Sequence, residues 1–199
     1  ASFDGIKRVR LGSLEPDHIT DEIIDGLAGI PKFCPQFHIS LQSGCDKTLK
    51  KMNRHYDSKH YMKIIKKVKK AIPNISLSTD IIVGFPGETE EDFMDTLDVV
   101  KKAEYDSAFT FIYSKRIGTP AASMEGQVPE EITKRRFDML LEAVGEGASK
   151  RCGRDVGKVL PVLVEDVNEQ HPELVTGRLS NNTLVHFPGD KNLVGQIVN

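Results

Sequence analysis

The chain has 199 residues, of which 39% are hydrophobic, enough for one substantial core and a second small module. Its 27 basic and 29 acidic side chains give a formal net charge of -2. Because the basic and acidic side chains are nearly equal in number, the chain has no overall electrostatic field that would mark a nucleic acid or a membrane as the partner. Without an apolar run of membrane-spanning length or a signal-peptide pattern, we expect a cytoplasmic protein that makes no membrane contact.

The first part of the chain alternates predicted strands and helices. Strands are expected over residues 6–14 and 37–41, and helices over residues 20–29, 46–52 and 58–72. Thr20 and Ser58 are residues that favour the N-cap position, and Gly29 ends the first of these helices. The third helix shows the 3.6-residue spacing of an amphipathic helix, with apolar residues at Tyr61 and Ile65.

The next strand is a nearly continuous apolar run from Ile75 to Phe85, interrupted by Asp80. Such runs are typical of parallel strands that are covered on both faces. Thr89 and Asp92 then bracket the first turn of a helix, a further strand is expected over residues 108–113, and a long helix begins at Pro129. This alternation predicts a parallel α/β sheet or barrel, whose ligands bind at the carboxyl ends of the strands.

The character of the sequence changes after Gly153. Four short β-rich runs, residues 159–164, 175–179, 183–187 and 193–198, are separated by Asn, Gly, Pro and Asp, which predicts a small antiparallel β-barrel. We therefore divide the chain into a partial barrel over residues 1–128, a connecting helix over residues 129–152 and a β-barrel domain over residues 153–199. The last strand is barely complete at Asn199, so this domain is expected to be truncated.

The three cysteines predict no metal site. Cys34, Cys45 and Cys152 lie far apart, with no Cys-x-x-Cys pair and no short Cys/His ligand spacing. An odd number of cysteines in such different contexts favours reduced thiols over a disulfide framework.

Polar or turn-forming residues follow three successive predicted strands, around Ser13, from Gln42 to Gly44, and from Asp80 to Gly84. In a βα barrel such strand ends converge on one ligand. Asp80 is the most informative, because a carboxylate in an apolar strand must be paired or hydrogen-bonded, and ligand hydroxyls are suitable partners. A structural role for Asp80, bonded to nearby backbone amides, is an alternative of equal weight.

Three segments, residues 42–54, 80–89 and 113–121, resemble in this order the radical S-adenosylmethionine (SAM) methylthiotransferases. The resemblance covers nearly the whole chain. It implies that residues 1–128 form the second half of a radical SAM partial (β/α)6 barrel. It also implies that residues 153–199 form a TRAM domain, an OB-like β-barrel that binds RNA in this family.

The resemblance implies a SAM site made of Ser13, Gln42, Ser43, Arg54, Asp80, Ile82 and Gly84. Gln42 and Asp80 would hold the ribose hydroxyls, and Ser13 would lie near the amino group of SAM. Ile82 and the backbone around Gly84 would lie against the adenine. Ser43 belongs to the same motif as Gln42.

Arg54 would hold the carboxylate of SAM in this arrangement. The chemistry agrees with the assignment, because a guanidinium group pairs with a carboxylate through two parallel hydrogen bonds. Taken alone, Arg54 would be interpreted as an ordinary surface arginine at a helix end. The ordered set of motifs favours the ligand role.

The sequence departs from the family in one respect. Radical SAM enzymes hold a 4Fe-4S cluster through Cys-x-x-x-Cys-x-x-Cys, a spacing that does not occur here. We therefore expect a carboxy-terminal fragment that is inactive alone, with the cluster ligands outside this chain. The cofactors implied for the parent enzyme are SAM and 4Fe-4S clusters. The implied partners are the anticodon stem-loop of tRNA, bound by the TRAM domain and the barrel mouth, and donors of sulfur and electrons.

Finer features favour a tRNA-modifying enzyme. Relatives that modify a ribosomal protein usually carry His after the Gln and an acidic pair before Gly-Thr, whereas Ser43 follows Gln42 here and residues 116–119 read Arg-Ile-Gly-Thr. Residues 8–16 resemble the subgroup that acts on threonylcarbamoyl-adenosine beside the anticodon. The alternatives are isopentenyl-adenosine in tRNA, a ribosomal protein, or a non-catalytic scaffold for RNA or protein. Acidic residues outnumber basic ones in residues 153–199, which leaves the scaffold open.

Overall fold

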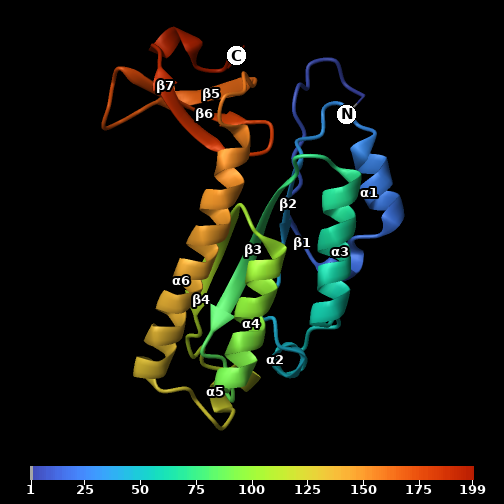
Figure 1. Cartoon of the computed structure of the whole chain (residues 1–199), viewed down its shortest axis with the longest axis vertical. Coiled ribbons are helices and arrows are strands. Elements are labelled where there is room, and N and C mark those ends of the chain that lie inside the picture. The colour runs from blue at the N-terminus through green and yellow to red at the C-terminus, as the bar shows by residue number, and fades with distance from the viewer. Residues whose placement is uncertain (1) are drawn as a thin grey trace.

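The fold is described from a computed structural model, which covers residues 2–199. It contains a parallel and an antiparallel sheet, and the long helix α6, Glu130–Cys152, runs beside the first and ends at the second (Figure 1). The parallel sheet has the order β1-β2-β3-β4, with strands Ser13–Leu14, Gln36–Ile39, Ser76–Val83 and Ser107–Ile112. Consecutive neighbours joined by helices are the arrangement of a βα barrel wall.

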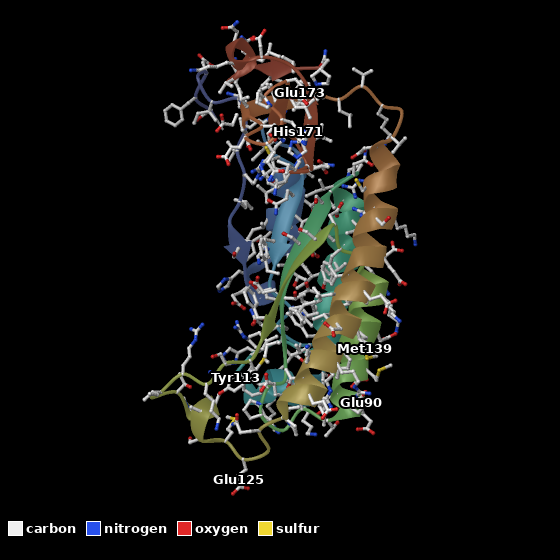
Figure 2. The ribbon with its side chains drawn as sticks, turned by 90° about the vertical axis from the view of Figure 1, so that its left-hand side faces the viewer. Glu90, Tyr113, Glu125, Met139, His171 and Glu173 are labelled. Atoms are coloured by element: carbon white, nitrogen blue, oxygen red, sulfur yellow. The ribbon has the colours of Figure 1, made fainter. Side chains whose placement is uncertain are left out.

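Helices cover one face of the parallel sheet, as Figure 2 shows from the side. They are α1 Asp21–Ala28, α2 Asp46–Lys51, α3 Ser58–Ala71, α4 Glu90–Ala103 and the long helix α6. The short helix α5, Pro120–Ser123, lies apart from them beyond the end of β4, and a 3-10 turn, η1, spans Pro16–His18. Their apolar stripes pack on alternate strand residues, so that Phe37 and Leu77 of the sheet join Tyr61, Phe93 and Leu140 of the helices in one buried core.

Local signals explain most helix starts. Thr89 Oγ1 accepts from the Asp92 amide at 3.2 Å while Asp92 Oδ2 accepts from the Thr89 amide at 2.9 Å, which confirms the capping role of this pair. The predicted cap of α3 was wrong by one residue. Asp57, not Ser58, accepts from the His60 amide, at 2.6 Å, because its carboxylate reaches the third amide of the helix.

The first predicted strand is much shorter than residues 6–14. Only Ser13 and Leu14 pair with β2, and Val9 makes a single bridge to Phe33. The segment before them turns toward the other sheet instead, where Arg8 donates to two backbone carbonyls, each at 2.9 Å.

The antiparallel sheet has the order β7-β6-β5-β8, with strands β5 Val162–Val167, β6 Leu174–Leu179, β7 Leu184–Pro188 and β8 Ile197–Val198. Two 3-10 turns, η2 Gly153–Asp155 and η3 Lys191–Leu193, flank it. The last strand is shorter than predicted because η3 takes Leu193 and the chain then turns at Gly195, which has φ 85°, before β8 begins. Within residues 2–199 the edge strands of this sheet are β7 and β8.

The helix predicted as a connector is also part of the first core. Leu140 and Ala143 of α6 are buried against the parallel sheet, while Arg151 and Arg154 at its far end pair with Asp106 before β4. The predicted class, α/β with a separate antiparallel β domain, is confirmed, and α6 ties the two parts together.

Candidate functional site

A cavity of about 860 Å³ lies at the carboxyl ends of the parallel strands, a volume typical of small-molecule sites. It is bounded by the ends of β3 and β4, by the turn between α2 and α3, and by the segment between β4 and α5. Its lining includes Gln42, Met52, Arg54, Asp80, Ile82, Phe85, Phe111, Tyr113, Arg116 and Met124. Tyr113 marks this end of the molecule in Figure 2.

Asp80 is held by side chains and not by the backbone amides of the structural alternative. Its Oδ2 accepts from His38 Nε2 and from Ser40 Oγ, both at 3.0 Å. His38 Nδ1 lies 3.1 Å from Ser78 Oγ, which Gln36 also contacts, so a chain of hydrogen bonds crosses the buried face of the sheet. Asp80 Oδ1 has no hydrogen bond within residues 2–199 and is available to a ligand.

Gln42 is held in a sparsely populated backbone conformation, with φ 64°. Its amide donates to the Asp80 carbonyl at 2.8 Å, and its carbonyl accepts from the Ile82 amide at 2.9 Å. These two bonds fix the residue at the strand mouth, while its side-chain amide makes no hydrogen bond in residues 2–199. Strain of this kind persists where the surroundings impose it, often at functional sites.

Arg54 lies at the edge of the cavity and pairs with Glu15. Its Nη1 donates to Glu15 Oε1 at 2.7 Å, and both side chains are partly exposed. Exposed pairs contribute little to stability, so a ligand carboxylate could replace Glu15 at small cost.

The apolar wall of the cavity comes from Ile82, Phe111 and Tyr113. Phe85 packs edge-on against Tyr113 with ring centroids 5.4 Å apart. The Tyr113 hydroxyl is buried and has no partner within residues 2–199, and such groups in native proteins are satisfied by water or by a ligand. Phe111 and Tyr113 were missed by the sequence reasoning, although their two-residue spacing in a strand places them on one face.

Two buried tyrosines fix the end of β2 beneath the cavity. Tyr56 donates to the Ser40 carbonyl at 3.0 Å, and Tyr61 donates to the Ile39 carbonyl at 2.9 Å. Burial raises the pKa of both phenols well above its usual value. They therefore remain protonated donors at neutral pH.

Three predicted site residues lie outside the cavity lining. Ser13 is exposed on β1, and Ser43 is buried toward α4, where its Oγ lies 3.3 Å from Thr96 Oγ1. Gly84 has φ +77°, and a Cβ there would lie 2.7 Å from the Thr133 side chain. The missing side chain of Gly84 therefore makes room for α6 in this structure, and the contact of its backbone with a ligand stays a prediction.

The residues present fit SAM but not an iron–sulfur cluster. Asp80 and Gln42 offer acceptors for hydroxyls, Arg54 offers a partner for a carboxylate, and the apolar wall can receive a flat base. Within residues 2–199, no group of three or more His, Cys, Asp or Glu side chains could hold a metal ion, and the three cysteines are free. No chemical step through a cluster is derived from these residues.

Comparisons with known proteins identify similar domains and a similar fold. Residues 4–100 match the radical SAM superfamily and residues 153–199 match the TRAM domain. The structure is similar to coproporphyrinogen III oxidase from Escherichia coli, described as a radical SAM enzyme, with a TM-score of 0.60 and 14% identity over 90% of this chain and 50% of that chain. Such low identity supports the fold alone, and the radical SAM match implies SAM and a 4Fe-4S cluster as cofactors.

Two curated relatives are named tRNA-2-methylthio-N(6)-dimethylallyladenosine synthase. The one from Lachnoclostridium phytofermentans is 54% identical over 98% of this chain and 43% of its own length. The one from Clostridium botulinum (strain Okra / Type B1) is 50% identical over all of this chain and 44% of its own length. The chain thus spans less than half the length of these relatives.

These names correct the predicted threonylcarbamoyl-adenosine subgroup. That prediction depended on residues 8–16, but the contacts of this segment are internal, since Arg8 bonds to the antiparallel sheet and Glu15 pairs with Arg54. The amino-acid sequence of this segment is therefore set by packing within the protein at least as much as by the substrate. The chain thus contains a region that matches the radical SAM superfamily, followed by a region that matches the TRAM domain.

Proposed function

We propose that this chain forms the SAM-binding and RNA-facing part of a methylthiotransferase that modifies dimethylallyl-adenosine (isopentenyl-adenosine) in tRNA. The observation that carries the proposal is the cavity at the carboxyl ends of the parallel strands, where Asp80, Arg54 and the apolar wall face one space. The names of the relatives support the reaction and its substrate.

In this proposal Asp80 Oδ1 and the Gln42 amide hold the ribose hydroxyls of SAM. Arg54 exchanges Glu15 for the SAM carboxylate, and Ile82 lies with Phe111 against the adenine. Bound SAM would supply the methyl group of the product. Of the other predicted residues, Ser43 and Gly84 lie in the loops that carry the site, and Ser13 lies on the edge strand β1.

The remaining assignments are proposals for the full-length protein. The TRAM match supports RNA as a partner, and we propose the anticodon stem-loop of tRNA, with sulfur and electron donors for the reaction. We also propose a cytoplasmic location, where tRNA is found. No helix of residues 2–199 combines the length and hydropathy that a bilayer crossing requires.

Nucleoside mass spectrometry of tRNA tests the substrate. Deletion of the encoding gene should abolish the methylthio derivative of dimethylallyl-adenosine, and the unmodified dimethylallyl-adenosine should accumulate. Loss of a methylthio group from threonylcarbamoyl-adenosine instead would overturn the substrate. Unchanged tRNA nucleosides would favour a ribosomal-protein substrate or the non-catalytic scaffold, which the acidic excess of the TRAM domain keeps as the second candidate.

A further inference from the structure

The segment between β4 and α5 lies at the mouth of the SAM cavity. Ser114, Arg116 and Thr119 line the cavity directly. Figure 2 shows the chain between Tyr113 and Glu125 projecting from the body, at the end of the molecule opposite His171 and Glu173 of the antiparallel sheet. This segment therefore borders the open side of the cavity.

Three successive side chains of this segment lack protein partners. Ile117 is fully exposed, at 104% of its reference area. Lys115 and Arg116 are exposed, and neither side chain makes an ion pair or hydrogen bond within residues 2–199. An isolated exposed apolar residue is ordinary. An apolar residue beside two unpaired cations at a cavity mouth suits single-stranded RNA, because its phosphates attract cations and its unstacked bases lose exposed surface against nonpolar side chains.

The other cations at the cavity mouth already have partners within the protein. Lys51 lines the cavity, and its Nζ lies 3.5 Å from the carbonyls of Pro86 and Gly87. Arg54 at the same mouth is already paired with Glu15. In the TRAM domain, six acidic residues outnumber the four basic ones, which are Arg154, Lys158, Arg178 and Lys191. That domain also lies beyond the far end of α6, whose 23 residues extend about 35 Å. Phosphates beside the reacting nucleotide therefore lie out of its reach.

We infer that residues 115–117 grip the substrate RNA next to the nucleotide in the cavity. Lys115 and Arg116 neutralise the flanking phosphates, and Ile117 packs against a neighbouring unstacked base. The inference rests on the proposed function, since it takes RNA as the substrate, and it assigns the contact that the TRAM domain cannot make from its position.

The test is the salt dependence of binding between the full-length protein and an anticodon stem-loop RNA. The double variant Lys115→Ala/Arg116→Ala should reduce the slope of log K against log salt by about 1.4, since each lost phosphate contact on single-stranded RNA removes about 0.7. Ile117→Ser should weaken binding by about tenfold, as expected for loss of one base contact, without altering the slope. Its SAM affinity should be unchanged because Ile117 does not line the cavity.

The matched control is Lys63→Ala/Lys66→Ala, which removes two exposed cations from the outer face of α3 and should leave the slope unchanged. An equal loss of slope in this control would show a general charge effect and overturn the inference. The inference would also be overturned if the Lys115→Ala/Arg116→Ala protein kept the wild-type salt slope and RNA affinity. The proposed function would still stand in that case. A wild-type protein that binds no RNA would overturn the proposed function and the inference together.

Discussion

Asp80 joins the sheet to the cavity through its two oxygens. Oδ2 is committed to His38 and Ser40, which leaves Oδ1 for the ligand. A hydrogen bond to a charged group contributes about 1.5–3 kcal/mol, so Asp80→Ala in the full-length protein should weaken SAM binding by about 10- to 100-fold, measured by isothermal titration calorimetry.

Ser43→Ala provides the control for Asp80→Ala. Ser43 was predicted to belong to the site, but its hydroxyl bonds within the protein, toward Thr96 and the Cys45 amide. Its removal should lower thermal stability and leave SAM affinity unchanged. The opposite pattern, with loss of affinity in Ser43→Ala alone, would move the site to the other side of the loop.

Asp92 should make the stability of the chain depend on acid pH. Burial alone would raise the pKa of its carboxyl, but hydrogen bonds from the Thr89 amide, the Cys45 thiol and the Lys47 ammonium outweigh burial and lower it. A carboxyl with a lowered pKa stabilises the fold above its ordinary pKa of about 3.9, and this contribution is lost as pH falls through the folded-state value. Asp92→Asn should therefore cost about 1–2 kcal/mol at pH 7 and progressively less below pH 4, measured by urea unfolding. A cost independent of pH would assign the effect to packing.

At the scale of elements, α6 braces the loop that follows β3. Arg136 is buried and donates to the Glu88 carbonyl at 3.1 Å and to Glu88 Oε1 at 2.8 Å, while Glu88 Oε1 also accepts from the Gly84 amide at 3.1 Å. Phe85 of the same loop lines the cavity. The helix thus fixes one cavity wall from outside.

Breaking this brace should be costly. Arg136→Met leaves Glu88 buried without its cation, and such losses cost about 3–5 kcal/mol. Burial raises the pKa of Glu88, so the loss should shrink at acid pH as Glu88 takes up a proton. Chemical denaturation of the 199-residue chain measures both. Arg135→Met is the matched control, because Arg135 is 57% exposed where it pairs with Glu90, and its loss should stay within about 1 kcal/mol.

Gly84 meets α6 so closely that two separate costs are expected from Gly84→Ala. The positive φ of +77° disfavours any side chain, and the new Cβ would lie 2.7 Å from Thr133. We expect a total destabilisation of about 2–4 kcal/mol. Thr133→Ala in the same chain should recover the steric part only. Complete recovery in this double-mutant cycle would mean that the backbone conformation costs nothing.

Elements with local signals were predicted well, and those set by distant contacts were not. The Thr89–Asp92 capping pair and the strand from Ile75 follow from neighbouring residues. The first strand was predicted too long because Arg8 is drawn to the antiparallel sheet, an interaction between residues far apart in sequence. In the same way, the strand-end motifs drew attention to Gln42 and Asp80, which line the cavity. The surroundings of Ser43 and Gly84 are instead set by packing against α4 and α6, which the local sequence does not show.

For the whole molecule, the two sheets are joined by more than the chain between them. Arg8 donates to carbonyls of Pro161 and Arg178 in the antiparallel half, and Asp106 before β4 receives Arg151 and Arg154 from the end of α6. One set of contacts starts near the beginning of the chain, at Arg8, and the other just before β4, at Asp106. They hold the TRAM sheet at the amino ends of the parallel strands, away from the cavity (Figure 1).

The length of α6 therefore sets both the distance of the TRAM sheet from the parallel sheet and the direction in which the TRAM sheet faces. Each residue added to α6 would advance the TRAM sheet by 1.5 Å and turn it by about 100°. Two added residues would turn the sheet by about 200°, away from Arg8, whereas seven would restore its facing to within about 20° while moving it about 10 Å. Length changes in this helix should accordingly be tolerated in steps of two turns, and only where Arg8 and Asp106 find new partners.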